Sequence, residues 1–276
     1  MESIELWQIA LIVLAGIGAG GINAVVGSGT LITFPVLVAF GVPPVVATMS
    51  NAVGLVPGNI ASSFGYREEL KGQWKRFAGF VPASLAGSLL GAYLLLHLPE
   101  DAFETIVPIL LVLALIMVVG QPYLSRHLKA RALRRREQGH DLAEAADPDA
   151  ARGGLSTGKY ILALVVIVLT AIYGGYFAAA QGIILVALLG LILTDDLQRL
   201  NGLKNVLVLV VNTVSATTYI IVGHDRINWT AVICVAVGSL IGGYLGARVG
   251  RKFSPGLLRT VIVVLGLVAI VRILTL

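Results

Sequence analysis

Two short breaks in the sequence carry residue types that suit the binding of a small charged ligand. The first is Gly27-Ser28-Gly29, followed by Thr30, and the second is Ala180-Gln181-Gly182. Each break opens a short apolar stretch, 29–41 or 182–193. A helix of 12 or 13 residues is roughly 18–20 Å long, too short to cross a hydrocarbon core of about 30 Å. We therefore expect two half-helices that begin inside a membrane.

The first turns of these half-helices would bind anions. Their amides have no intrahelical partner and carry partial positive charge, so two facing N-termini make an anion site without a formal charge. Glycine allows a backbone to approach a ligand closely. The alternative is that these glycines only relieve crowding between helices.

Lys204 is the basic residue that we expect to be drawn into the membrane, early in the segment 199–223. Its charge would pair with an anionic substrate, or its side chain would extend to the cytoplasmic face; the sequence favours neither. Asparagines within apolar runs would bind substrate or join helices to one another. We expect the site at one cavity near the bilayer midplane. The predicted substrate-binding residues are Asn23, Gly27, Ser28, Gly29, Thr30, Asn51, Gln181, Gly182, Lys204 and Asn205.

The sequence gives no pattern for catalysis. No acidic residue falls clearly inside a predicted span, which disfavours a proton relay of Asp or Glu and an aspartyl intramembrane enzyme. The histidines lie at segment edges, so a serine enzyme has no base in the membrane. Cys234 has no Cys/His cluster for a metal, and no nucleotide-binding Gly-rich motif is present. We therefore expect no enzyme, no metal and no cofactor.

The elements that position these residues follow from composition. The chain is 57% hydrophobic and 13% charged, against about 25% charged in soluble domains. Long uncharged runs predict an all-α integral membrane protein, because a lipid-exposed backbone must satisfy its own hydrogen bonds. Ten segments are expected, two of them the half-helices: 5–26, 29–41, 44–66, 76–97, 103–124, 159–180, 182–193, 199–223, 228–248 and 256–275.

Charge predicts the orientation of these segments. If the N-terminus is outside and all ten change sides, 18 of 20 Lys and Arg residues lie inside. Both termini are then outside. The charged stretch 125–158 becomes a cytoplasmic linker, partly helical at most, between the units 1–124 and 159–276.

The two units resemble each other in sequence. Gly20-Gly21 matches Gly174-Gly175, and Gly87–Tyr93 (GSLLGAY) matches Gly238–Tyr244 (GSLIGGY). Each unit has an odd number of segments, so the second must be inverted in the membrane. Inverted repeats with broken helices are a transporter architecture.

The stretch 20–51, GGINAVVGSGTLITFPVLVAFGVPPVVATMSN, resembles the first signature of the sulfite exporter family of the TauE/SafE type. The stretch 172–205 resembles the second, and Lys204 falls where the family often has Lys. The family's glycine runs are GSG and AAAQG here, and Asn23 stands where relatives often have Asp. The resemblance implies export of small sulfur-containing anions, such as sulfite or organosulfonates, across the bacterial inner membrane.

The leading hypothesis is a secondary transporter, an exporter of such an anion, working by alternating access with proton coupling left open. The alternatives are an anion channel and a structural membrane subunit without transport activity. The expected partners are the small anionic substrate and the lipid bilayer, without nucleic acid. A homo-oligomer is compatible with the sequence.

Overall fold

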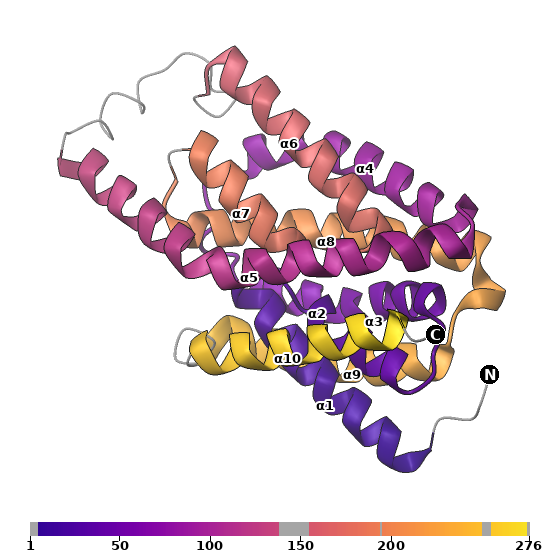
Figure 1. Cartoon of the computed structure of the whole chain (residues 1–276). Helices are drawn as coiled ribbons and strands as arrows, with labels where there is room; N and C mark the ends of the chain where they lie inside the picture. Colours follow the sequence, from indigo (N-terminus) through magenta and orange to yellow (C-terminus); the bar gives the residue numbers. More distant parts are fainter. Residues whose placement is uncertain (1–4, 138–154, 194, 250–254, 275–276) are drawn as a thin grey trace.

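The computed structural model describes residues 5–137, 155–193, 195–249 and 255–274. All regular structure in these ranges is helical (Figure 1). The elements are α1 Leu6–Val25, α2 Thr30–Ala39, α3 Pro44–Gly65, α4 Trp74–His97, α5 Glu100–Glu137, α6 Thr157–Tyr176, α7 Gln181–Ile192, α8 Leu197–Val222, the 3-10 turn η3 His224–Arg226, α9 Trp229–Val249 and α10 Pro255–Leu274.

The helices have the length and surface of membrane spans. Six of the described helices are long and apolar enough to cross a bilayer: α1, α4, α5, α6, α8 and α9. Large apolar side chains such as Leu14, Ile116 and Ile233 are about 60% exposed (60%, 63% and 62%) on outward faces, which lipid would cover. The chain is therefore a multi-pass membrane protein.

The expected segments correspond to the helices within a few residues, with one clear difference. Helix α5 continues to Glu137, so residues 125–137 of the expected linker are helical. The apolar pattern ends near residue 124, but an Ala-, Arg- and Leu-rich sequence such as LKARALRRRE has high helix propensity and extends the helix. Residues 138–154 of the expected linker lie outside the described residues, and its last two residues, Thr157 and Gly158, belong to α6.

Contacts between helix ends show which connections between helices lie at the same end of the molecule. At one end the Trp7 ring packs edge-on against Phe40, with 5.4 Å between ring centroids. At the other end the Arg76 guanidinium forms an ion pair with Asp195. In Figure 1 the start of α1 and the end of α10 are on the right, and the end of α5 and the starts of α6 and α10 are on the left. The stretches 67–76 and 195–204, which the charge pattern assigns to the inside, therefore share an end.

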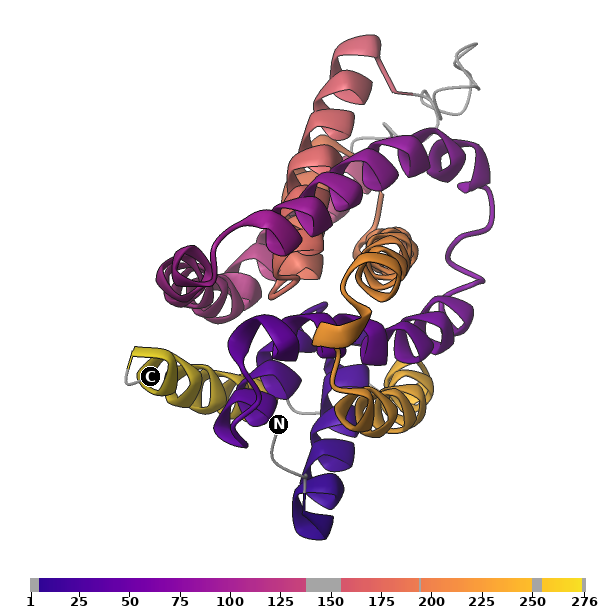
Figure 2. The ribbon, with the colours of Figure 1, turned by 90° about the vertical axis from the view of Figure 1, so that its right-hand side faces the viewer.

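The packing of the first five helices is matched by that of the last five. Helix α1 packs on α9 as α6 packs on α4, and α3 packs on α9 as α8 packs on α4. Figure 2 shows α4 with α6 at the top and α1 with α9 at the bottom. Helix α2 likewise contacts α10, as α7 contacts α5.

The matched GSLLGAY and GSLIGGY motifs form two of these contacts. A Cβ built on Gly16 of α1 would lie 3.1 Å from the Cα of Gly238 in α9. A Cβ built on Gly87 of α4 would lie 2.7 Å from the Cβ of Ala171 in α6. The small residues therefore let both helix pairs approach closely, as in other membrane helix interfaces.

Candidate functional site

The two sequence breaks meet in the interior. The amide of Gly182, at the start of α7, donates a hydrogen bond of 3.0 Å to the carbonyl of Gly27, just before α2. A Cβ on Gly27 would lie 2.5 Å from the Cα of Gly182, and Gly27 has a φ of +87°. Glycine is needed at Gly27 for both the left-handed backbone and the close approach. The N-termini of α2 and α7 therefore begin at one crossing point.

Lys204 of α8 reaches into this crossing. Its side chain is 1% exposed, and its Cδ lies 2.9 Å from a Cβ built on Gly182. The Nζ atom donates to the carbonyls of Asn23 (3.0 Å) and Ala24 (3.2 Å) at the end of α1. Lys204 thus lies inside the protein and does not extend to the cytoplasmic face.

The local backbone explains why these carbonyls accept from Lys204. The amides of Val26 and Gly27 both bond to Ile22 O, so the helical hydrogen bonds of α1 end there and leave the carbonyls of Asn23 and Ala24 for other donors. Terminal carbonyls of a helix need external donors. The Asn205 amide also donates to Ala24 O, at 3.2 Å.

Asn23 ties the first break to α3. Its Oδ1 lies 3.4 Å from the amide of Gly29, the N-cap of α2, and its Nδ2 donates to Asn59 Oδ1. Asn23 is 7% exposed. The predicted residues Asn23 and Gly29 are therefore linked directly, through the first free amide of the half-helix.

Thr30 and Asn51 are hydrogen-bonded to each other. The Asn51 Nδ2 donates to Thr30 Oγ1 at 3.2 Å, and Thr33 Oγ1 donates to Asn51 Oδ1. These bonds join α2 to α3. For Asn51 the structure therefore displays the helix-joining role that the sequence left open beside substrate binding, and Thr30, predicted as a substrate ligand, is one of its partners.

Ser28 and Gln181 are buried with free polar atoms. Ser28 is 0% and Gln181 2% exposed, and among the described residues Ser28 Oγ and both polar atoms of Gln181 have no hydrogen-bond partner. Buried polar side chains in folded proteins are normally paired. Ser28 adjoins Gly27 and Gln181 adjoins Gly182 in sequence, and the Gln181 amide group lies against Gly174 of α6, where a built Cβ would be 2.4–2.6 Å from it.

Several other buried residues share this property, among them Gln73, Ser84 and Tyr176, and three of them lie on α3 and α8: Asn59, Asn212 and Ser215. Each is buried and has a polar side-chain atom without a partner in the described structure. Sequence reasoning placed them among polar residues in apolar runs and not in the site. A signal for them exists in the sequence, since the segment 48–66, which is α3 and the residue that follows it, and α8 carry matching polar residues 153 positions apart. The pairs are Thr48 and Asn201, Asn51 and Lys204, Asn59 and Asn212, Ser62 and Ser215, and Tyr66 and Tyr219.

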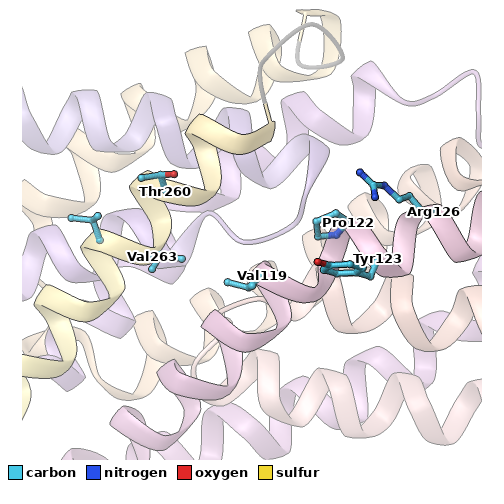
Figure 3. Close-up of a pocket in the computed structure, with 7 residues that line it drawn as sticks. Val119, Pro122, Tyr123, Arg126, Thr260 and Val263 are labelled. Carbon is cyan, nitrogen blue, oxygen red and sulfur yellow. The ribbon is translucent and has the colours of Figure 1, made fainter.

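A hollow of about 550 Å³ lies elsewhere, between α5 and α10 (Figure 3). It is lined mainly by apolar side chains, among them Val119 and Val263, with Tyr123 and Arg126 on the α5 side. None of the predicted site residues lines it. A cavity at the crossing of the two breaks therefore stays a prediction.

The crossing favours negative charge. Two helix N-termini and the Lys204 ammonium converge there, and among the described residues Lys204 has no ion pair with a carboxylate. The carbonyls at the end of α1 offset part of this potential but bring no formal charge. A small anion at the crossing would meet the Lys204 ammonium and the positive ends of two helices, next to the unpaired hydroxyl of Ser28.

Comparison with known proteins agrees with this chemistry. The family described as "Sulfite exporter TauE/SafE" matches residues 12–273. A "Probable membrane transporter protein" of Haemophilus influenzae is 22% identical over 258 residues, covering 93% of this chain and 91% of that protein. The "Probable membrane transporter protein YfcA" of Escherichia coli K12 is 24% identical, covering 93% and 86% respectively.

A shorter match reaches higher identity. The "Probable membrane transporter protein ORF9" of Sinorhizobium is 28% identical over 112 residues, 41% of this chain and 43% of that protein. No solved structure matches the chain significantly. Because the family match extends over nearly the whole sequence, this chain belongs to the sulfite exporter TauE/SafE family.

Proposed function

We propose that this protein is a secondary transporter that exports a small sulfur-containing anion, sulfite or an organosulfonate, from the bacterial cytoplasm. The family is one of transporters and not of enzymes. Sulfite enters the proposal through the family's description, and the anionic character of the substrate is supported by the site itself.

The observation that carries the proposal is the burial of Lys204 where two half-helices begin. A buried ammonium without a counter-ion is costly, and such residues in membrane proteins mark substrate or ion pathways. The same arrangement of helix N-termini at broken helices binds anionic groups of substrates in other transporter folds. The proposed ligands are Lys204, Ser28 and Gln181. The amides of Gly29 and Gly182 already donate to Asn23 Oδ1 and Gly27 O, so they would bind the anion only by exchanging those acceptors for it.

Alternating access is proposed as the mechanism. The matched contacts of α1–α5 and α6–α10 support two inverted repeats, because the main contacts, such as α1 with α9 and α3 with α9, have counterparts in α6 with α4 and α8 with α4. The five residue pairs with a constant spacing of 153 support the same relation. Exchange of conformations between the repeats would open the site to alternate sides of the membrane.

The proposed location is the bacterial inner membrane. The end that carries 67–76 and 195–204 would face the cytoplasm, following the positive-inside rule. The linker 125–158 would then be cytoplasmic and both termini outside.

Counterflow in proteoliposomes tests the function. Purified protein is reconstituted with unlabelled sulfite inside, and uptake of labelled sulfite is followed with and without a pH gradient. A carrier gives a transient accumulation of label that saturates with concentration, whereas a channel gives simple equilibration. Sulfate, chloride, acetate and taurine serve as competitors that separate sulfur oxyanions from other anions.

The variant Lys204→Met should lose this counterflow, and Lys159→Met, which removes an exposed lysine at the start of α6, should keep it. Absence of saturable counterflow for sulfite and for every organosulfonate tried would overturn the proposed substrate class. Simple equilibration of label without overshoot would favour a channel.

A further inference from the structure

A second group of free polar atoms lies deeper along α8 than Lys204, where α8 passes α3. Helices α3 and α8 are in contact and antiparallel. A Cβ built on Gly202, near the start of α8, would lie 3.6 Å from Tyr66 O just after α3, and one on Gly223, after α8, would approach the Met49 side chain near the start of α3. The two contacts fix the register of the helix pair.

This register brings Asn59 and Asn212 to about the same depth. From the Met49–Gly223 contact, Asn59 is ten residues along α3 and Asn212 eleven along α8; from the Tyr66–Gly202 contact they are seven and ten residues away. The rise of a helix is about 1.5 Å per residue, so the two asparagines lie within about 5 Å of the same height. Asn59 and Asn212 are also one of the residue pairs spaced 153 positions apart. In two inverted repeats, equivalent residues lie at the same height only at the level of the axis that relates the repeats.

The free atoms at this level are complementary in chemistry. Asn59 Nδ2 is a donor without a partner among the described residues, while Asn59 Oδ1 accepts from Asn23. Asn212 Oδ1 is an acceptor without a partner, and the Ser215 hydroxyl, one turn further on, is also free. All three side chains are at most 3% exposed. Such atoms in a protein interior call for a ligand or water that the protein itself does not supply.

These atoms connect to the crossing of the two breaks. Asn23 bonds Asn59 with its side chain and accepts from Lys204 with its carbonyl, so the same residue contacts both groups. A ligand between them would meet one formal positive charge, at least one amide donor, and an acceptor. The positive charge matches a single negative charge, and the acceptor requires a hydrogen on the ligand.

We propose that Asn59, Asn212 and Ser215 form a second set of substrate ligands, which selects a singly protonated oxyanion such as hydrogensulfite. Lys204 and Asn59 Nδ2 bind its charged oxygens, and Asn212 Oδ1 with the Ser215 hydroxyl accepts the hydrogen bond of its O–H group. This rests on the proposed function and narrows it, because organosulfonates carry no such O–H group. A site built for a hydroxyl rejects an analogue without it far more strongly than an apolar pocket rejects an extra group.

Methanesulfinate is the matched probe, since it replaces the O–H of hydrogensulfite by a methyl group and keeps the single charge. Unlabelled sulfite and methanesulfinate compete with labelled sulfite in the counterflow assay, and both are titrated onto the detergent-solubilised protein by calorimetry. Wild-type protein should prefer sulfite by about tenfold or more. In Asn212→Ala and Ser215→Ala the preference should fall to within about threefold. Thr217→Ala, which changes an exposed hydroxyl on the same helix, should keep the wild-type preference.

Equal competition by methanesulfinate in the wild type overturns the proposal without any variant, as does an unchanged preference in folded Asn212→Ala and Ser215→Ala. Sulfite binding with the expected preference but without counterflow supports this ligand set and contradicts the transport function. Counterflow of sulfite without preference contradicts this ligand set alone. Protein that neither binds nor transports sulfite contradicts both.

Discussion

Lys204 places a formal charge among carbonyl groups rather than beside a carboxylate. Its two acceptors are carbonyls in the last turn of α1, so the ammonium also caps that helix. A substrate anion would compete with these carbonyls for the same hydrogen atoms. In the proposed role, Lys204 would give up these hydrogen bonds to bind substrate, so binding would be coupled to the end of α1.

Two replacements of Lys204 should separate the effect of its charge on transport from its effect as a cap of α1 on stability. Lys204→Met removes both. It should lower kcat/KM for sulfite by about 10- to 100-fold, because charge-assisted hydrogen bonds contribute about 1.5–3 kcal/mol, and it should lower stability by about 1 kcal/mol through the lost helix cap. Lys204→Gln keeps a donor for the carbonyls without the charge. It should recover thermal stability but not transport. Recovery of transport by Lys204→Gln would show that capping, not charge, is the role of Lys204.

At the scale of elements, the crossing of α2 and α7 depends on the absence of side chains. Gly27→Ala would place a Cβ 2.5 Å from Gly182 and force a left-handed alanine, and we expect a loss of at least about 2 kcal/mol in stability together with loss of transport. Gly120→Ala is the matched control, since a Cβ there has no neighbour within 4 Å. It should leave stability unchanged or raise it by about 0.5–1 kcal/mol. Thermal unfolding in detergent measures both; similar midpoints for the two variants would contradict a tight crossing.

The element boundaries were predictable from the sequence because uncharged runs and helix length constrain membrane spans closely. The short runs 29–41 and 182–193 became α2 and α7 for this reason. The direction of Lys204 was not predictable, since burial and extension to the surface fit the same position in α8. Its direction depends on free carbonyls of α1, which are about 180 residues away in sequence. The unpaired polar atoms of Asn59 and Asn212 were not predicted either, because each asparagine, taken alone, fits a residue that joins helices by hydrogen bonds.

The Arg76–Asp195 ion pair joins the two halves at one end. Both side chains are largely buried, at 13% and 10% exposure, and Arg199 lies 3.6 Å from the same carboxylate. Asp195→Arg should lower the thermal midpoint and transport, because it brings three cations together. The double variant Arg76→Asp/Asp195→Arg should recover part of both, by about 1 kcal/mol or more. Additive effects in the double-mutant cycle would mean that the pair contributes nothing to holding this end together.

At the scale of the whole molecule, the orientation in the membrane decides the direction of transport. Contacts between helix ends put the basic stretches 67–76 and 195–204 together, and they put Phe40 beside Trp7 near the N-terminus. Whether a helix and the half-helix after it cross the whole membrane or only part of it, the start of the first and the end of the second stay on one side. The two short helices α2 and α7 therefore do not change this grouping of the helix ends. The positive-inside rule then assigns the basic end to the cytoplasm.

Cysteine labelling in intact cells tests this assignment. Cys234 is buried and is replaced by alanine to give a background without thiols. Single cysteines are then placed at Asp225, in η3, and at Lys71, in the connection between α3 and α4; both side chains are exposed, at 104% and 72%. A membrane-impermeant maleimide should label Asp225→Cys in intact cells, and Lys71→Cys only after the membrane is opened. Because the two positions lie at opposite ends of the helices, the reverse pattern would invert the whole molecule and turn the proposed exporter's cytoplasmic face outward. Labelling of both positions in intact cells would contradict the two-sided grouping of the helix ends itself.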